Sequence, residues 1–165
     1  MYNKALLLLL TLSMVFVSCA DNTDSDPETP LGIIESSLAY FEGKIVEKTI
    51  EKVNGIDAWK IKIENEIGSI LSFYWQIGSL ILIQVDGSRG PFNYDLSPGT
   101  NLINFSSART LAMGQVQNTN ILNWILRQDI DRNNKYLYVF DFENSSNLSI
   151  KIYVDAENGN ILQID

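Results

Sequence analysis

The sequence closes with VDAENGNILQID, residues 154–165, and this stretch decides how the last part of the chain folds. Its acidic and amide side chains around Gly159 could form a calcium loop, a carboxylate cluster or a tight turn between two strands. An EF-hand loop needs glycine at its sixth position and a bidentate acid at its twelfth. Counted from Asp155, glycine is the fifth residue and the chain stops before the twelfth. Because Asp, Asn and Gly favour turns, we predict a strand, a tight turn and a final strand.

The segments before this turn combine one short helix with alternating strands. Ser106 or Ser107 is expected to cap a helix that ends at Gly114. Strands are predicted at residues 121–130, 135–143, 148–154 and 161–164. One strand carries aromatic residues on a single face, namely Tyr136, Tyr138, Phe140 and Phe142. Such a stripe is either core beneath a helix, which we favour, or a stacking platform for sugars or peptides.

The preceding part of the chain repeats the same order of elements. A helix is predicted to start at Thr29-Pro30 and to end at Gly43. Its apolar face is expected to consist of Leu31, Ile34, Leu38 and Phe41. Four strands should follow, at residues 44–53, 58–64, 69–76 and 80–85. The economical explanation is a duplication within an α+β protein.

The order of helix, glycine, long strand, hairpin and terminal turn resembles the PepSY domain of bacterial exported proteins. The matching residues include 108–114, 136–142 and above all 154–162, with 43–47 and 58–63 in the first copy. The resemblance implies two PepSY-like units, residues 30–86 and 105–165, joined by a connecting loop at residues 87–104. In each unit a helix would pack on a four-stranded antiparallel sheet. The resemblance also implies a role in restraining secreted peptidases or other exported partners, and no catalytic residues.

The beginning of the chain predicts export and an anchor. Lys4 precedes the apolar run at residues 5–17, which has the length of a signal-peptide core and is too short to span a bilayer. Val17-Ser18-Cys19 resembles the lipobox of bacterial lipoproteins, although Phe16 replaces the usual Leu or Val. We therefore expect residues 1–18 to be a signal peptide and Cys19 to be lipidated. Residues 19–29 would be an acidic tether, and the protein would be anchored in the cell envelope, on the outer-membrane, periplasmic or surface side. Ordinary cleavage near Ala20 and an uncleaved anchor are the alternatives.

The composition excludes several kinds of chemistry. The sequence has no histidine and a single cysteine, so that Ser-His or Cys-His catalysis and a zinc, copper or iron site are not expected. Loss of residues 1–18 removes Lys4 and no acidic residue, so that the net charge becomes 11 minus 20, or −9. That charge argues against nucleic acid as a partner. We expect a protein without a cofactor that is not an enzyme.

The remaining candidates are surface residues that could hold a partner. Tyr74 should leave the helix-covered side of its strand, because Phe73 and Trp75 would share the inner face. The connecting loop contributes Arg89, Phe92 and Tyr94. These four residues predict binding of an exported protein, such as a peptidase. A surface lipoprotein that binds carbohydrate or another small ligand is the alternative.

Overall fold

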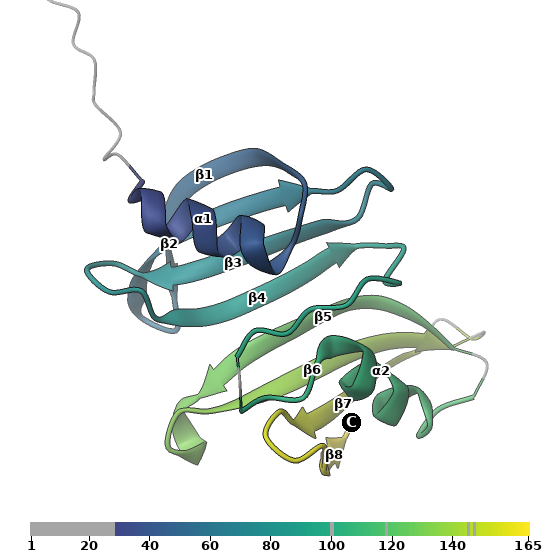
Figure 1. The fold of residues 1–165 in the computed structure, drawn as a ribbon. Helices are drawn as coiled ribbons and strands as arrows, with labels where there is room; N and C mark the ends of the chain where they lie inside the picture. The colour runs from purple at the N-terminus through teal and green to yellow at the C-terminus, as the bar shows by residue number, and fades with distance from the viewer. Residues whose placement is uncertain (1–28, 100, 118, 145, 147) are drawn as a thin grey trace, which may run out of the picture.

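Eight strands form one antiparallel sheet in chain order, and two helices pack against it (Figure 1). The structure, a computed structural model, describes residues 29–165 except 100, 118, 145 and 147. The elements are α1 (Leu31–Tyr40), β1 (Lys44–Val53), β2 (Ile56–Glu64), β3 (Ile70–Gln76), β4 (Leu82–Arg89), α2 (Phe105–Met113), β5 (Thr119–Asp129), the 3-10 turn η1 (Ile130–Arg132), β6 (Lys135–Asn144), β7 (Ser149–Asp155) and β8 (Ile161–Ile164). The predicted α+β class is confirmed, and β4 runs on to Arg89, which the sequence placed in a loop.

The strands of both predicted units belong to a single continuous sheet, a point that the sequence left open. Each helix precedes four strands, but β4 pairs directly with β5, from Gln84 opposite Arg127 to Gly87 opposite Trp124. A side chain at Gly87 would be impossible here, because its Cβ would lie 1.9 Å from Trp124 Nε1. Because glycine has no side chain, the indole of Trp124 can lie close to the β4 backbone. The division of the chain into two repeats remains a prediction.

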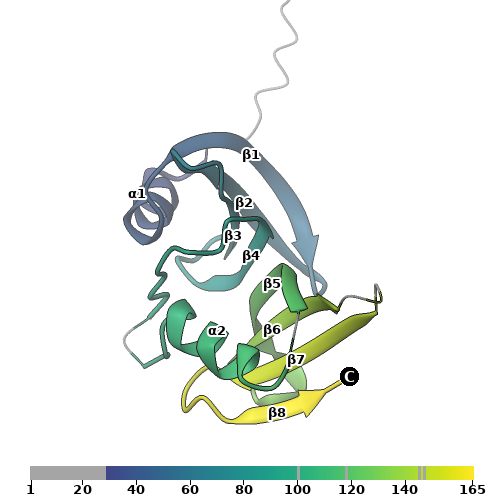
Figure 2. The same cartoon turned by 90° about the vertical axis from the view of Figure 1, so that its right-hand side faces the viewer.

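Both helices cover the same face of the sheet (Figure 2). One hydrophobic core runs beneath them, from Ile33 of α1 to Val154 and Ala156 near the C-terminus. The aromatic stripe of β6 lies in this core, since Tyr138, Phe140 and Phe142 are fully buried and Tyr136 packs against it. The interpretation of the stripe as core beneath a helix is therefore confirmed.

The buried face of α1 differs from the predicted one. Leu31 is exposed, whereas Ile33 and Ser37 are buried together with Phe41. Ser37 enters the core because its polar atoms are satisfied there: Ser37 Oγ donates to the Ile33 carbonyl at 2.8 Å and accepts from Trp75 Nε1 at 2.9 Å. A buried donor needs such a partner. The bond to Trp75 therefore favours the orientation of α1 in which Ser37 faces the core.

The cap of α2 also differs from the prediction. Asn104, rather than Ser106 or Ser107, is the N-cap, and its side chain accepts a hydrogen bond from the Ser107 N–H at 2.9 Å. This bond satisfies one of the free N–H groups at the start of the helix. The cap fixes the point where the connecting loop becomes helix.

The C-terminal stretch forms a tight turn between β7 and β8, as predicted. Asp155 Oδ1 accepts hydrogen bonds from the N–H groups of Glu157 at 2.8 Å and Asn158 at 3.3 Å. Gly159 adopts a φ of +78°, which glycine accepts without strain. The acidic side chain therefore serves the turn itself.

The predicted signal peptide, Cys19 and most of the tether lie outside the described residues. Within residues 29–165, as far as they are described, neither helix is long and apolar enough to cross a membrane.

Candidate functional site

The face of the sheet opposite the helices carries polar side chains at its centre. Strand pairing places Lys60 beside Tyr74 and Gln84 beside Arg127. Tyr74 also pairs with Gln84, so that one row crosses β2, β3, β4 and β5. We call this surface the open face and define it by Lys60, Tyr74, Gln84, Asp86 and Arg127. Neither α1 nor α2 covers it (Figure 2).

Tyr74 points away from Phe73 and Trp75, as predicted, but its ring is not freely exposed. Only 7% of Tyr74 is accessible, because it packs with Ala58 and Ile83. Burial raises the pKa of Tyr74, and the neighbouring Asp86 carboxylate raises it further. Tyr74 is therefore uncharged, and its side chain is largely buried within the open face. The face was predicted correctly, whereas the degree of exposure was not.

Asp86 is the carboxylate of the open face, and its pKa is raised. Burial raises its pKa, while hydrogen bonding by Tyr74 and Gln84 acts in the opposite direction. Gln84 Nε2 donates to Asp86 Oδ1 at 2.8 Å. The carboxylate is thus partly desolvated before any partner arrives, which reduces the further cost of covering it.

Arg127 brings a positive charge into the same surface. Its Nε is buried, and among the described residues this atom has no hydrogen-bond partner. A buried donor without a partner is energetically costly. Sequence reasoning missed this residue, although alternation from the buried Leu126 would have placed it on the open face.

Ion pairs extend the open face towards the edge strand β1. Lys60 Nζ lies 2.8 Å from Glu51 and 3.1 Å from Glu47, and Lys62 Nζ lies 3.2 Å from Glu47. Hydrogen bonds from both lysines lower the pKa of Glu47. Partial burial acts to lower the pKa of Lys60, but its bonds to the two glutamates raise it overall. The charges at this edge are therefore mutually neutralised.

The structure does not bring the four predicted partner-binding residues together. Tyr74 lies on the open face, whereas Phe92 and Tyr94 pack against the core on the helix-covered side. Arg89 ends β4 with an exposed side chain, and its Nη1 lies 4.0 Å from Glu64 Oε1. The middle of the loop, at Tyr94 and Asp95, lines a cleft.

Tyr94 is chiefly a structural residue. Its hydroxyl accepts a hydrogen bond from Trp124 Nε1 at 2.8 Å. Its ring stacks on Phe105 and meets the edge of Phe41, each with a centroid distance of 5.1 Å. It therefore ties the connecting loop to both helices and to β5.

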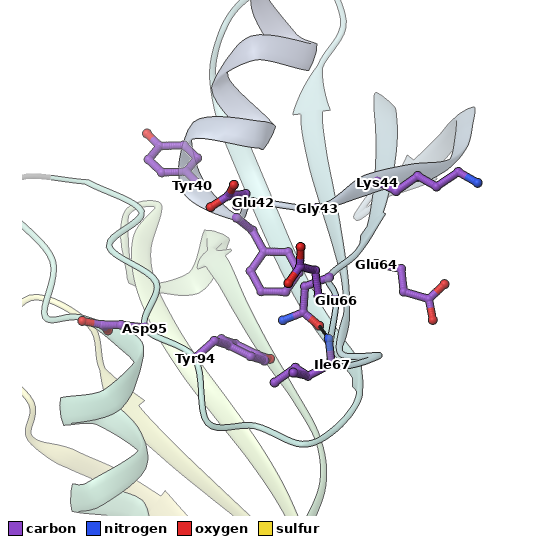
Figure 3. A pocket seen from close by; sticks show the side chains of 11 residues that line it. Tyr40, Glu42, Gly43, Lys44, Glu64, Glu66, Ile67, Tyr94 and Asp95 are labelled. Atoms are coloured by element: carbon purple, nitrogen blue, oxygen red, sulfur yellow. Dashed lines mark hydrogen bonds between the residues drawn. The ribbon is translucent and has the colours of Figure 1, made fainter.

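A cleft of about 830 Å³ lies where the end of α1, the β2–β3 turn and the connecting loop meet (Figure 3). It is lined by Tyr40, Phe41, Glu42, Gly43, Lys44, Glu64, Asn65, Glu66, Ile67, Tyr94 and Asp95. Its walls are held in place, since Ser69 Oγ of the turn donates to the Pro91 carbonyl of the loop at 2.6 Å. The cleft is a preformed cavity at one end of the sheet.

The lining of the cleft combines carboxylates with aromatic rings. Glu42, Glu64, Glu66 and Asp95 contribute negative charge, and Lys44 is the one lining cation among the described residues. In Figure 3 the Lys44 side chain points away from Glu42 and Glu66. The described part of the chain holds no group of three His, Cys, Asp or Glu side chains suited to a metal. The lining suits a basic or hydroxyl-bearing ligand.

Comparison with known proteins gives three results. The search of curated proteins finds no match. A solved structure described as a "putative lipoprotein" from Clostridium difficile 630 is similar over 82% of this chain and 88% of its own, with 15% sequence identity and a TM-score of 0.38. The PepSY family, described as "Peptidase propeptide and YPEB domain", matches residues 102–165. The match runs from the entry into α2 to the C-terminus and covers less than half of the chain.

Proposed function

We propose that this protein is a non-catalytic lipoprotein of the bacterial cell envelope that binds an exported protein, such as a peptidase, and inhibits or chaperones it. The PepSY domain at residues 102–165 supports a role like that of a peptidase propeptide. The observation that carries the proposal is the open face. Neither α1 nor α2 covers it, and it carries the half-buried Arg127 and a partly desolvated carboxylate.

The proposal includes an anchor at Cys19 and a tether over residues 19–29. The lipobox-like Val17-Ser18-Cys19 and the apolar run before it support this part. Mass spectrometry of the mature N-terminal peptide tests it: we expect acyl groups on Cys19, and none in the Cys19→Ala variant. A mature protein that starts beyond Cys19, or carries no acyl group there, refutes the anchor.

The absence of catalysis is part of the proposal. The sequence has no histidine, and the perturbed Tyr74 and Asp86 lie within one polar network of the sheet rather than in the cleft. A general acid or base has to reach the atoms that react. We therefore assign these residues to recognition.

The open face is tested with two charge reversals of equal size. Arg127→Glu changes the centre of the face, and Arg132→Glu changes the exposed turn after β5. The acylated protein is cross-linked in intact cells, the captured exported protein is identified by mass spectrometry, and its activity is measured with increasing amounts of each variant. We expect R127E to abolish capture and R132E to retain it. Equal capture by both variants contradicts the proposal.

The cleft supports a second candidate, the binding of carbohydrate or another small ligand. Aromatic rings that stack on sugars and carboxylates that accept hydroxyl hydrogen bonds are both present in its lining. A glycan array with wild-type protein and the Tyr40→Ala variant tests it. Binding that is lost in Y40A supports this function, and a glycan array without hits removes it.

A further inference from the structure

Four exposed apolar side chains belong to the end of the sheet where α1 begins. Leu31 is 66% exposed, Leu80 65%, Ile81 48% and Ile77 41%. Leu31 starts α1, and the other three belong to the turn between β3 and β4. A Cβ on Gly32 would lie 3.7 Å from Leu80 Cδ2, so that this turn packs against the first turn of the helix. We call these four residues the apolar edge patch.

The turn that carries the patch has a fixed backbone. The Gln76 N–H donates to the Ile81 carbonyl at 2.9 Å, and the Ile77 N–H donates to the Asp57 carbonyl at 3.1 Å. Gly78 adopts a φ of +80°. These bonds fix the backbone of the turn on which the two exposed isoleucines and the exposed leucine lie. Exposed apolar side chains that are clustered and rigidly held indicate a contact surface.

The two segments that carry the patch have no charge, although the chain as a whole is acidic. Residues 30–34 are PLGII and residues 77–81 are IGSLI, with no charged side chain in either segment. The N-terminal tether also arrives here. Thr29 is buried, and the N–H groups of Ile33 and Ile34 donate to the Pro30 carbonyl, so that the chain enters the domain beside the patch.

We propose that the apolar edge patch rests on the lipid bilayer in which the protein is anchored. This inference depends on the proposed lipid anchor at Cys19. Thr29 lies ten positions after Cys19, a span of at most about 33–36 Å. The anchor therefore keeps the patch within reach of the membrane surface, where apolar side chains insert at the boundary of headgroups and acyl chains.

A second copy of the chain is a poorer occupant. Stable protein interfaces use about 20–30 residues on each side, whereas the patch has four. Four apolar side chains suffice for a surface that is already held close by an anchor, because the anchor removes most of the cost of association.

Docking through the patch would orient the domain. The patch lies at the start of α1, and the acidic cleft includes Tyr40 to Lys44 at the opposite end of this helix (Figure 1). The cleft and the far ends of β2 and β4 would then point away from the bilayer, towards an exported partner.

Two fluorescent labels test this orientation, one in the turn before β4 and one at the far end of β4. Ser79→Cys places a thiol in the patch turn, and Ser88→Cys places one at the exposed far end of β4. Cys19 is the single native cysteine, so that an acylated protein takes up label only at the new site. The acylated full-length protein is reconstituted in phosphatidylethanolamine and phosphatidylcholine vesicles that contain lipids with brominated acyl chains.

We expect the label at position 79 to be quenched and shifted to the blue, and the label at position 88 to remain unchanged. Adding Leu80→Ser and Ile81→Ser to S79C should remove the quenching while the acyl chains keep the protein on the vesicles. Equal quenching at both positions, quenching that survives L80S/I81S, or shielding of position 79 by a second copy without vesicles overturns the inference. If wild-type protein takes up label at Cys19, the anchor itself is absent and docking fails with it. If Cys19 is blocked but position 79 is unquenched, docking fails and the anchor stands.

Discussion

Replacing Tyr94 with phenylalanine separates a structural role of this residue from a role in binding. The hydroxyl accepts a hydrogen bond from Trp124 Nε1 at 2.8 Å, and Trp124 is completely buried. The Tyr94→Phe variant keeps the ring and removes only this acceptor. The indole N–H then has no obvious replacement in the core, so that the main effect should be on stability.

The expected loss follows from the unsatisfied donor. A buried N–H without a partner costs about 1–3 kcal/mol. The contacts of the ring with Phe41 and Phe105 are retained, so that no cavity contributes to the loss. For chains of roughly 150 residues each kcal/mol lowers Tm by about 2–4 °C. We therefore expect Tm to fall by about 2–12 °C.

Thermal unfolding followed by circular dichroism measures the change in Tm. Tyr40→Phe is the matched control, because Tyr40 also lines the cleft but no hydrogen bond of its hydroxyl is found among the described residues. A double-mutant cycle with Trp124→Phe isolates the pair. A loss in Y94F no larger than in Y40F, or additive losses in the cycle, refutes the reasoning.

Three further substitutions test the core and the open face. Ser37→Ala removes the acceptor of the Trp75 indole, so that the free energy of unfolding should fall by about 1–2 kcal/mol after a gain in helix propensity of roughly 0.5 kcal/mol. Gly43→Ala would place a Cβ 2.5 Å from the backbone oxygen of Glu64, and we expect chemical denaturation to show a loss of about 1–3 kcal/mol. Burial raises the pKa of Asp86 in the folded protein, so that the ionised carboxylate opposes folding above that pKa. Asp86→Asn should therefore gain in Tm over wild type as the pH rises from below about 3.9 towards neutrality.

Each of these variants has a control in the same kind of position. Ser36→Ala changes the neighbouring, less buried serine of α1. Gly99→Ala adds a Cβ whose nearest neighbour would lie 3.8 Å away. Asp131→Asn changes an exposed carboxylate. If a control variant loses or gains as much stability as the variant it is paired with, the corresponding interpretation is wrong. The same holds if the Tm difference between D86N and wild type is equal at low and at neutral pH.

The element order could be read from the sequence because its signals are local. The alternation of apolar and polar residues along 135–143 matches β6, Lys135–Asn144. The turn at 155–160 follows from side chains that bond their own backbone. Where long-range contacts intervene, local reasoning failed. A bulge at Leu122 interrupts the alternation of β5 and leaves this apolar residue exposed. The hydrogen bond to Trp75 places Ser37 in the core, whereas the predicted core residue Leu31 is exposed.

The candidate site was the less predictable part. Alternation placed Tyr74 on the correct face of β3, but its burial against Ala58 and Ile83 depends on strands whose register the sequence does not reveal. The grouping of Arg127 with Gln84 requires the pairing of β4 with β5, across the whole loop and α2. The cleft likewise joins α1, a turn and the loop, which lie far apart in the sequence.

The sequence by itself determined the succession of helices and strands, the terminal turn and the expectation of an anchored, exported protein. These depend on periodicity, on backbone preferences and on short motifs, which act over a few neighbouring residues. The tertiary structure alone decided that eight strands share one sheet, which polar groups are buried on its open face and where the apolar edge patch lies. These features arise from contacts between distant residues, such as Trp124 against the bare backbone of Gly87, and no local pattern encodes them.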